Sequence, residues 1–325
     1  MNLKSVEEIQ ANIRVILRMD LDVPEGDNSR LLKSVPIIRY LIEKGCHLAI
    51  IGHKGRPKGR EERHSLRPVY LELMGILGDV DSIFLDDFEV ITDKPLMFFE
   101  NLRFWKGEET NNNNFMKNLI DTSQAFVNDA FAVAHRTHAS IMLHTVLDTY
   151  YGFSFLEEAE KISKLLENPE RPLTIVLGGA KEDKLSYLPE LANIADKILI
   201  GGKLPKITNY ELRITNEKII WGKLSESGLD LSDETIKQFI ELISSSKTLV
   251  WAGSMGFYED ASSRVGTEAI AQAIANTAAY KIIAGGDTSA SIKNLGLKDK
   301  IDFICSGGGV LLEFLTKKTL PAWNN

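Results

Sequence analysis

The chain has 325 residues, of which 44% are hydrophobic, with a net charge of −7 and only two cysteines. This length favours about two domains with ordinary apolar cores, and the acidic balance argues against nucleic acid or an anionic membrane as a partner. Cys46 and Cys305 each lie in or at the end of an apolar run, and no run is long enough for a membrane span or a secretory leader. We therefore expect a disulfide-free protein of the reducing cytoplasm.

The first predicted strand, residues 14–17, runs into an acidic segment, RMDLDVP at residues 18–24. Alternation along extended chain puts Asp20 and Asp22 on one face. Two such acids can bind a metal, orient a hydroxyl or simply form a turn, and the segment considered alone favours the turn. The next predicted element is a helix that begins at Arg30 and ends near Gly45, a typical C-cap glycine.

The loop after the second predicted strand, residues 47–51, is basic and rich in glycine. The segment GHKGRPKGR at residues 52–60 holds five basic or imidazole side chains among three glycines. An exposed basic turn is one interpretation. Glycine spacing at the end of a strand is also what a phosphate-binding nest requires, in the place where open α/β sheets bind ligands. The pattern therefore favours an anion site.

Further strands are predicted at residues 82–85, 96–99 and 125–127, with a helix at 68–77. The segments ENLRF (100–104) and NDAFAVAHRTHAS (128–140) follow the last two strands. His135 and His138 are three residues apart and could indicate zinc, but no cysteine or suitably spaced third ligand accompanies them. Arg136 is better interpreted as a cation that faces the same ligand as His53, Arg56 and Arg103.

A helix predicted from Phe155, with apolar residues at helical spacing to Leu166, leads into a turn marked by Pro169 and Pro172. The apolar strand 173–177 and the segment GGAK at residues 178–181 follow. Small residues at a strand end let a ligand approach the backbone, and Lys181 supplies a point charge suited to phosphate. We expect this stretch to join two lobes, with the reaction between them.

Later strands are predicted at residues 197–200, 248–251, 280–284 and 301–305, with helices at 185–194, at 266–277 and after the last strand. Each of these strands leads to glycines, at residues 201–202, 253 and 256, 285–286, and 307–309. Glycine-bearing strand-to-helix turns supply backbone donors for phosphates. The sequence has no G-x-x-x-x-G-K-[ST] motif and no strand followed by G-x-G-x-x-G with a later acid, so a P-loop NTPase and a dinucleotide-binding fold both fit poorly.

The motifs occur in the order found in the phosphoglycerate kinase family, which the chain resembles over nearly its whole length. The segments that carry the resemblance are RMDLDVP, GHKGRP, ENLRF, NDAFAVAHRTHAS, ENPERP, GGAK, WAGSMGFYE, AGGDTSA and SGGGVLLEFL. The resemblance implies an α/β fold of two doubly wound lobes, each a mainly parallel sheet flanked by helices and joined by a hinge helix. The expected domains are 1–154 for phosphoglycerate, 155–172 for the hinge, 173–315 for nucleotide and 316–325 as a tail.

The resemblance also assigns residues. It implies phosphoglycerate binding by Asp20, Leu21, Asp22, Arg30, His53, Lys54, Gly55, Arg56, Arg103 and Arg136. It implies nucleotide binding by Gly179, Ala180, Lys181, Lys184, Gly228, Leu229, Glu259, Gly285, Gly286, Asp287 and Thr288. Asp287 would hold Mg²⁺ through the nucleotide phosphates, and the residues expected to stabilise the transferring phosphoryl group are Arg30, Lys181, Gly285 and Gly308.

The implied activity is reversible, Mg²⁺-dependent phosphoryl transfer between 1,3-bisphosphoglycerate with ADP and 3-phosphoglycerate with ATP, by a monomer that closes about its hinge. A non-catalytic relative that binds phosphoglycerate or nucleotide as a regulator, and a kinase for another carboxylate, are the alternatives. The sequence departs from the family in places. Asp22 replaces the usual asparagine, Lys181 and Lys184 are three rather than four residues apart, Ala284 stands where a third glycine is usual, and Trp251-Ala252-Gly253-Ser254 lacks the usual asparagine and proline. Segment 201–220 is shortened, and Lys203-Leu204-Pro205 replaces a glycine and a methionine there.

Overall fold

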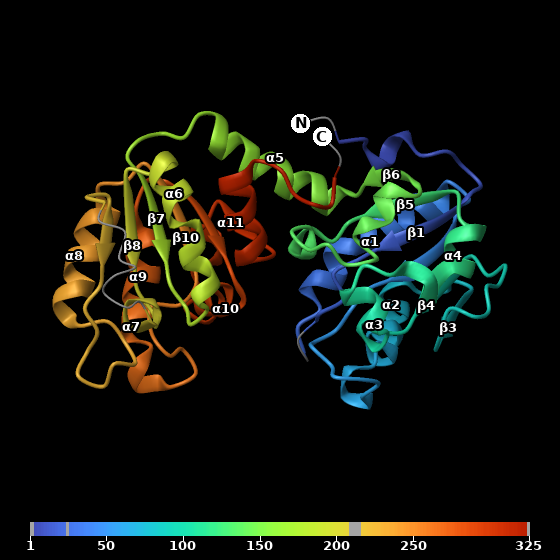
Figure 1. Ribbon diagram of the computed structural model, residues 1–325, viewed down its shortest axis with the longest axis horizontal. Coiled ribbons are helices and arrows are strands. Elements are labelled where there is room, and N and C mark those ends of the chain that lie inside the picture. The colour runs from blue at the N-terminus through green and yellow to red at the C-terminus, as the bar shows by residue number, and fades with distance from the viewer. Residues whose placement is uncertain (1–2, 24–25, 208–215, 324–325) are drawn as a thin grey trace. The chain divides into compact units, whose positions relative to one another are not determined.

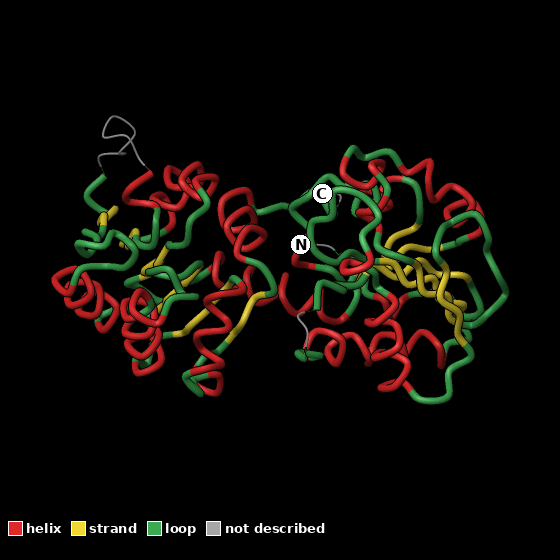
Figure 2. Tube along the Cα trace, turned by 90° about the horizontal axis from the view of Figure 1, so that it is seen from below, coloured by secondary structure: helices red, strands yellow, loops and turns green. Residues whose placement is uncertain are grey.

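The computed structural model describes residues 3–23, 26–207 and 216–323. The chain divides into two compact units, one of residues 1–160 with 319–325 and the other of residues 161–318. Each unit has its own sheet of six strands (Figures 1 and 2). Within both sheets every pair of neighbouring strands is parallel, which confirms the predicted α/β fold of two doubly wound lobes.

The first unit contains strands in the order β3-β4-β2-β1-β5-β6. Its elements are β1 (Arg14–Arg18), α1 (Ser29–Glu43), β2 (His47–Ile51), α2 (Arg67–Leu77), β3 (Ser82–Leu85), β4 (Leu96–Phe99), α3 (Lys106–Glu109), α4 (Lys117–Thr122), β5 (Ala125–Asn128) and β6 (Asp148–Tyr151). Alternation divides the apolar side chains of the strands between two faces. Val15 and Leu17 pack with α1 and α2, whereas Ile16 packs with Met116 and Leu119 beside and on α4.

The second unit has the strand order β12-β11-β10-β7-β8-β9. Its elements are β7 (Leu173–Leu177), α6 (Leu188–Ile194), β8 (Lys197–Ile200), α7 (Leu204–Ile207), β9 (Ile219–Trp221), α8 (Asp233–Ser244), β10 (Thr248–Ala252), α9 (Val265–Asn276), β11 (Tyr280–Ala284), α10 (Gly286–Asn294), β12 (Phe303–Cys305) and α11 (Gly308–Lys317). Apolar residues of α8, α9 and α10 pack with Val176, Leu199 and Trp251 on one face of the sheet. Helices α6 and α11 contact each other and strands β8 and β11 (Figure 1).

The chain passes between the units at two places. Helix α5 (Phe153–Glu167) carries it from the first unit to the second, and the residues after Lys318 return to the first. In the first unit the hydroxyl of Tyr151 donates to the carbonyl of Ala322 at 3.0 Å, and Trp323 meets the ring of Phe155 edge-on at 5.8 Å. The last described residues are therefore part of the first unit's core.

The structure corrects the predicted elements at several points. The helix predicted for residues 185–194 begins at Leu188, because residues 182–187 form a 3₁₀ turn. Strands β6 and β9 and helices α3, α7 and α8 are among the elements that were not predicted. None of the helices in the described part of the chain is both long and apolar enough to cross a membrane.

Candidate functional site

In the first unit, β1 and β5 are neighbours although the chain forms β2, β3 and β4 between them. Strands β2, β4 and β3 continue the sheet on one side of β1, and β5 and β6 continue it on the other. At such a switch point the loops after the strands diverge and leave room for a ligand beyond their carboxyl ends. The acidic segment after β1 and the basic loop after β2 both leave the sheet at this edge.

The acidic segment is held within the first unit by an ion pair and by hydrogen bonds. Arg30, in the first turn of α1, lies 3.1 Å from Asp20 Oδ2 and donates at 2.9 Å to the carbonyl oxygen of Asp22. Asp22 Oδ1 accepts from the amide of Gly55 at 2.9 Å. Burial raises the pKa of Asp20, and the cations of Arg30 and Arg18 oppose that shift. The segment is thus tied to α1 and to the basic loop, and Pro24 lies outside the described residues.

The basic loop is held in a fixed shape by the turn after β4. Gly55 has φ +62°, a conformation that favours glycine, and its carbonyl accepts from Arg103 Nη1. The fully buried amide of Asn101 donates at 2.7 Å to the carbonyl of Lys54. Burial lowers the pKa of Arg103, and Glu109, whose Oε1 lies 3.6 Å from Arg103 Nε, opposes this.

The predicted phosphoglycerate residues differ in how far they are exposed. The charges of Asp22 and Arg56 both act on Arg103, so these three side chains are close together, and Arg56 and Arg136 are exposed. Leu21 is fully buried, and its side chain occupies the space that a Cβ on Gly52 would need. The side chain of Leu21 therefore packs in the core, and Arg56 and Arg136 are open to solvent.

Sequence reasoning missed a buried polar group beneath these residues. Arg18 is the last residue of β1 and is only 1% exposed, and Glu108 and Ser140 are fully buried. The signal in the sequence was alternation, because Arg18 shares the face of Ile16 and must be buried with it. Glu108 and Ser140 come from segments distant in sequence, which no local pattern relates to Arg18.

In the second unit the switch point lies between β7 and β10. The turns after these strands bond directly to each other. The amide of Gly178 donates to Ala252 at 3.1 Å, and the amide of Gly179 donates to Ser254 at 2.7 Å. A Cβ on Gly253 would lie 2.4 Å from the carbonyl oxygen of Gly178, so only glycine allows this approach of two backbones. The glycine-rich turns after β7 and β10 therefore pack against each other through main-chain atoms.

Lys181 and Lys184 occupy different environments. Lys181 is exposed and has extended backbone, so the two lysines do not lie on one α-helix. Lys184 Nζ donates at 2.7 Å to Gly178 O and at 3.1 Å to Ala252 O. Burial first, and then the charge of Lys181, lower the pKa of Lys184 to about 8. A partly buried ammonium therefore lies directly under the two turns, with Lys181 outside.

Helices α10 and α11 begin next to each other. A Cβ on Gly308, the first residue of α11, would lie 3.8 Å from the Cα of Gly285, the N-cap of α10. Thr288 is buried, and its hydroxyl accepts from the amide of Gly253 at 3.0 Å. The first turns of helices leave backbone amides unpaired and carry a partial positive charge, which favours phosphate. Asp287 is exposed in the first turn of α10.

The loop predicted to bind adenine has one exposed apolar side chain, that of Leu229. Gly228 has φ +66°, and the carbonyl of Leu229 accepts from the amide of Phe257 at 2.8 Å. Leu229, Phe257 and Val265 are 50–54% exposed. The buried carboxylate of Asp230 accepts from the amide of Gly266 at 2.9 Å and so fixes this loop to α9. Glu259 is exposed in the turn that follows Phe257.

Among residues 3–23, 26–207 and 216–323, no group of three or more His, Cys, Asp or Glu side chains is arranged to hold a metal ion. The carboxylate of Asp287 has the hard oxygen ligands that Mg²⁺ prefers. It is exposed beside the first turns of α10 and α11, so it fits an ion that arrives with nucleotide phosphates. His138 lies among cations, and burial first, then Arg103 and Arg18, lowers its pKa to about 4.

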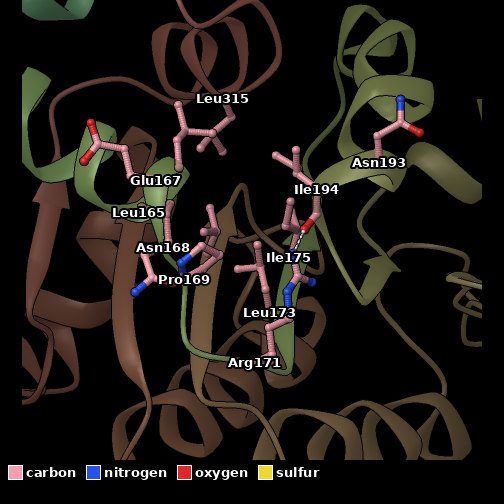
Figure 3. Close-up of a pocket in the computed structure, with 12 residues that line it drawn as sticks. Leu165, Glu167, Asn168, Pro169, Arg171, Leu173, Ile175, Asn193, Ile194 and Leu315 are labelled. Carbon is pink, nitrogen blue, oxygen red and sulfur yellow. Dashed lines mark hydrogen bonds between the residues drawn. The ribbon is translucent and has the colours of Figure 1, made fainter. Parts of the chain in front are cut away.

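A cavity of about 300 Å³ lies in the second unit away from these groups (Figure 3). It is lined by residues at the end of α5 and the start of β7, including Asn168, Arg171 and Leu173. Arg171 Nη1 pairs with Asp196 at 2.7 Å, and Nη2 donates to the carbonyl of Ile194 at 3.2 Å. Because the glycine turns follow the carboxyl ends of the strands, this cavity is at the opposite edge of the sheet and is not the predicted nucleotide site.

A family model described as phosphoglycerate kinase matches residues 6–210 and 206–318. The phosphoglycerate kinase of Finegoldia magna is 34% identical to the chain, over 99% of this chain and 98% of the relative. That of Thermosipho africanus is also 34% identical, over 95% and 93% respectively.

Two solved structures are similar over the whole chain. The phosphoglycerate kinase of Coxiella burnetii has a TM-score of 0.80 at 29% identity and covers 99% of this chain and 98% of that one. The phosphoglycerate kinase of Pyrococcus horikoshii has a TM-score of 0.81 at 25% identity and covers 98% and 97%.

The comparisons also bear on the predicted shortening after residue 201. The alignment with the Finegoldia magna protein spans 388 positions, whereas this chain has 325 residues, so that protein has residues that this chain lacks. The two stretches of the family match meet at residues 206–210, inside segment 201–220. Residues 208–215 lie outside the described part of the chain.

Proposed function

The chain belongs to the phosphoglycerate kinase family, and from this premise we propose that it transfers a phosphoryl group reversibly between ATP and the carboxylate of 3-phosphoglycerate. The observation that carries the proposal is a pair of arrangements suited to anions, each at the switch point of a parallel sheet. One is cationic, around Asp22, Gly55 and Arg103, and the other is formed by the glycine turns after β7 and β10. A kinase for a phosphorylated carboxylic acid requires both kinds of group.

The chemistry places particular demands on such an enzyme. The carboxylate of 3-phosphoglycerate is already ionised at neutral pH, so its attack on the γ-phosphoryl group needs no general base. The obstacle is the repulsion between two polyanions, together with the charge that spreads over the transferring group. Catalysis then rests on positioning, cations and backbone donors rather than on proton transfer.

The first unit is proposed to bind phosphoglycerate. Arg56, Arg103 and Arg136 would neutralise the phosphate, and Asp20, Asp22 and His53 would orient the hydroxyl and carboxylate end. Gly55 and Lys54 would contribute the main chain of the basic loop, whose shape is already fixed by Arg103 and Asn101. Asp22 is proposed to hold the loop through the Gly55 amide, so its negative charge is partly satisfied within the protein.

The second unit is proposed to bind the nucleotide. The first turns of α10 and α11, with Lys181 and Lys184, would receive the phosphates, and the loop at Leu229 would receive the base, with Glu259 near the ribose. Asp287 would hold a magnesium ion that arrives with the nucleotide phosphates. That ion would supply positive charge to the transferring group, and Arg30 and Lys181 would supply the side-chain charge.

Transfer requires phosphoglycerate and nucleotide to meet, so the proposal includes closure about the segment 156–172 and exclusion of water from the acyl phosphate. It also includes a monomeric state. A reducing cytoplasmic location is supported by Cys46 and Cys305, which are buried and form no disulfide within the described part of the chain.

Steady-state assays of ADP formation test this function. We expect ADP only when ATP, 3-phosphoglycerate and magnesium are all present. Arg30→Ala and Lys181→Ala should each lower kcat by at least about a hundredfold, since each removes a charge on the transferring group. Arg56→Ala should mainly raise KM for 3-phosphoglycerate.

The matched controls are Arg63→Ala in the first unit and Lys298→Ala in the second, which remove exposed cations of two short 3₁₀ turns. Both controls should keep wild-type kinetics. Binding of 3-phosphoglycerate without any turnover would contradict the kinase function and favour a regulatory relative. Turnover with another carboxylate but not with 3-phosphoglycerate would contradict the substrate.

A further inference from the structure

A chain of buried hydrogen bonds runs from Glu108 to His53 beneath the candidate phosphoglycerate site. Glu108 Oε1 accepts from the hydroxyl of Ser140 at 2.6 Å, and Glu108 Oε2 accepts from the Ser140 amide at 3.0 Å. Arg18 Nε then donates to the Ser140 oxygen at 3.1 Å, and Arg18 Nη2 lies 2.9 Å from His53 Nδ1. Arg18 Nη1 also donates to the carbonyl of Met19.

The direction of every bond in this chain follows from the groups that make it. A guanidinium has donors only, so His53 Nδ1 must accept and cannot carry a proton. The hydroxyl of Ser140 gives its one proton to the carboxylate of Glu108, which leaves its lone pairs for Arg18 Nε. The imidazole of His53 therefore has its proton on Nε2 and is neutral.

The charges around His53 act in the same direction. Arg18 from β1, Arg30 from α1, Arg103 from the turn after β4 and His138 from the loop after β5 all face it, and burial together with these groups lowers the pKa of His53 well below its ordinary value. The carboxylates of Glu108 and Asp20 act on Arg18. A fourth positive charge on the ring would be repelled by three arginines.

We propose that Glu108, Ser140 and Arg18 are positioning residues that hold His53 as the neutral Nε2–H tautomer, so that it contributes a hydrogen-bond donor of fixed identity to phosphoglycerate binding rather than a positive charge. The role in binding rests on the proposed function, whereas the tautomer itself does not. The cationic charge of the site would then come from arginines and Lys54 alone. Substrate affinity should in consequence show no titration of His53 between pH 6 and pH 8.5.

The tautomer can be measured directly on the substrate-free protein. Long-range ¹H–¹⁵N spectra of full-length protein labelled at histidine nitrogens distinguish a protonated ring nitrogen from an unprotonated one, and His53→Gln assigns the signal. We expect Nε2 protonated and Nδ1 unprotonated from pH 6 to pH 8.5. A protonated Nδ1, or an imidazolium at pH 7, would overturn the proposal whether or not the protein is a kinase.

The positioning role is tested by Ser140→Ala, with Ser140→Thr to restore the hydroxyl. The alanine variant should show a mixture of tautomers or an imidazolium at pH 6, and KM for 3-phosphoglycerate should vary with pH by about fivefold, the effect of roughly one hydrogen bond. The threonine variant should return both readouts toward wild type.

Ser123→Ala is the matched control, since Ser123 is another buried serine of the first unit, bonded to Leu119 O and not to this chain. It should leave the His53 signal and the pH profile of KM unchanged. If Ser140→Ala keeps its fold but also leaves both unchanged, Glu108 and Ser140 do not position His53. A kcat effect of equal size at every pH, without a change of tautomer, would likewise contradict the proposal.

Discussion

At the scale of single residues, the second unit depends on glycines for two separable reasons. One is backbone conformation, because Gly202 and Gly296 have φ values of +61° and +65°, which favour glycine. The other is space. A Cβ on Gly202 would lie 2.4 Å from the backbone nitrogen of Gly179, whereas a Cβ on Gly296 would meet nothing within 4 Å. Comparison of the two positions therefore separates the cost of backbone strain from the cost of a steric clash.

Substitution of these two glycines by alanine should reveal the difference. Gly296→Ala should cost about 1–2 kcal/mol of unfolding free energy through left-handed strain alone. Gly202→Ala should cost roughly 1–3 kcal/mol more, since the new methyl must displace main chain of the turn at Gly179. Urea unfolding of both variants measures this. Equal losses would mean that the contact between the two turns does not constrain the second unit.

Arg18 and Lys184 illustrate what a single sequence conceals at this scale. Both were visible as cations, yet in the structure Arg18 is buried and Lys184 partly buried, and each donates to backbone carbonyls. Burial of a charge depends on partners from other elements, which periodicity within one element cannot indicate. The exposed cations Arg56 and Lys181 needed no such partners, and their loops could be predicted from glycine spacing at strand ends.

At the scale of elements, the first turn of α5 is bound by a carboxylate from a different segment. Asp129, directly after β5, accepts from the amide of Phe155 at 3.1 Å, and a Cβ on Gly152 would lie 2.4 Å from its Oδ1. Its Oδ2 is buried without a hydrogen-bond partner among the described residues. Burial, and then the charge of Glu158, raises the pKa of Asp129 to about 7 against hydrogen bonds that lower it. The cap of α5 therefore titrates near neutrality.

Asp129→Asn should separate this titration from the rest of the protein. The folded state holds the Asp129 proton up to about pH 7 and the unfolded chain releases it near pH 3.8, so this residue's contribution to stability falls as pH rises between those values. Asparagine keeps the acceptor for Phe155 and has no charge. Its stability relative to wild type should increase from pH 4.5 to pH 7.5 by an amount on the order of 1–4 kcal/mol.

Chemical denaturation at the two pH values provides the test, and Asp148→Asn is its control. Lys4 lowers the pKa of Asp148, so that carboxylate's contribution is lost only in more acid solution and stays constant across this window. If the Asp129→Asn difference is the same at both pH values, Asp129 is not protonated in the folded protein at pH 4.5.

Most elements could be predicted because apolar runs and breakers mark them. The strands at residues 47–51 and 173–177 match β2 and β7 to the residue. Helix α8 was missed although its sequence carries a signal. Ser232 is its cap, and Ile236, Phe239 and Ile243 are buried at helical spacing. Strands β6 and β9 had weaker signals. β9 has only three residues, and β6 opens with the exposed Asp148, so sheet pairing rather than local pattern defines them.

At the scale of the whole molecule, one construction occurs twice. In each unit the chain first fills one side of a central strand, β1 or β7, and then continues on that strand's other side with β5 or β10. Each unit thereby gains a ligand-binding edge at its switch point. The sequence supplies cations to one edge and glycines, with their backbone donors, to the other. Transfer between two anions requires both kinds of group.

The central claim, phosphoryl transfer to a carboxylate, is tested most directly by trapping the product. Purified protein with ATP, magnesium and 3-phosphoglycerate, in the presence of hydroxylamine, should release ADP and an equal amount of the hydroxamate that an acyl phosphate forms. Omission of either 3-phosphoglycerate or magnesium should abolish both products. ADP released without hydroxamate, or neither product under conditions where both substrates bind, would contradict the account.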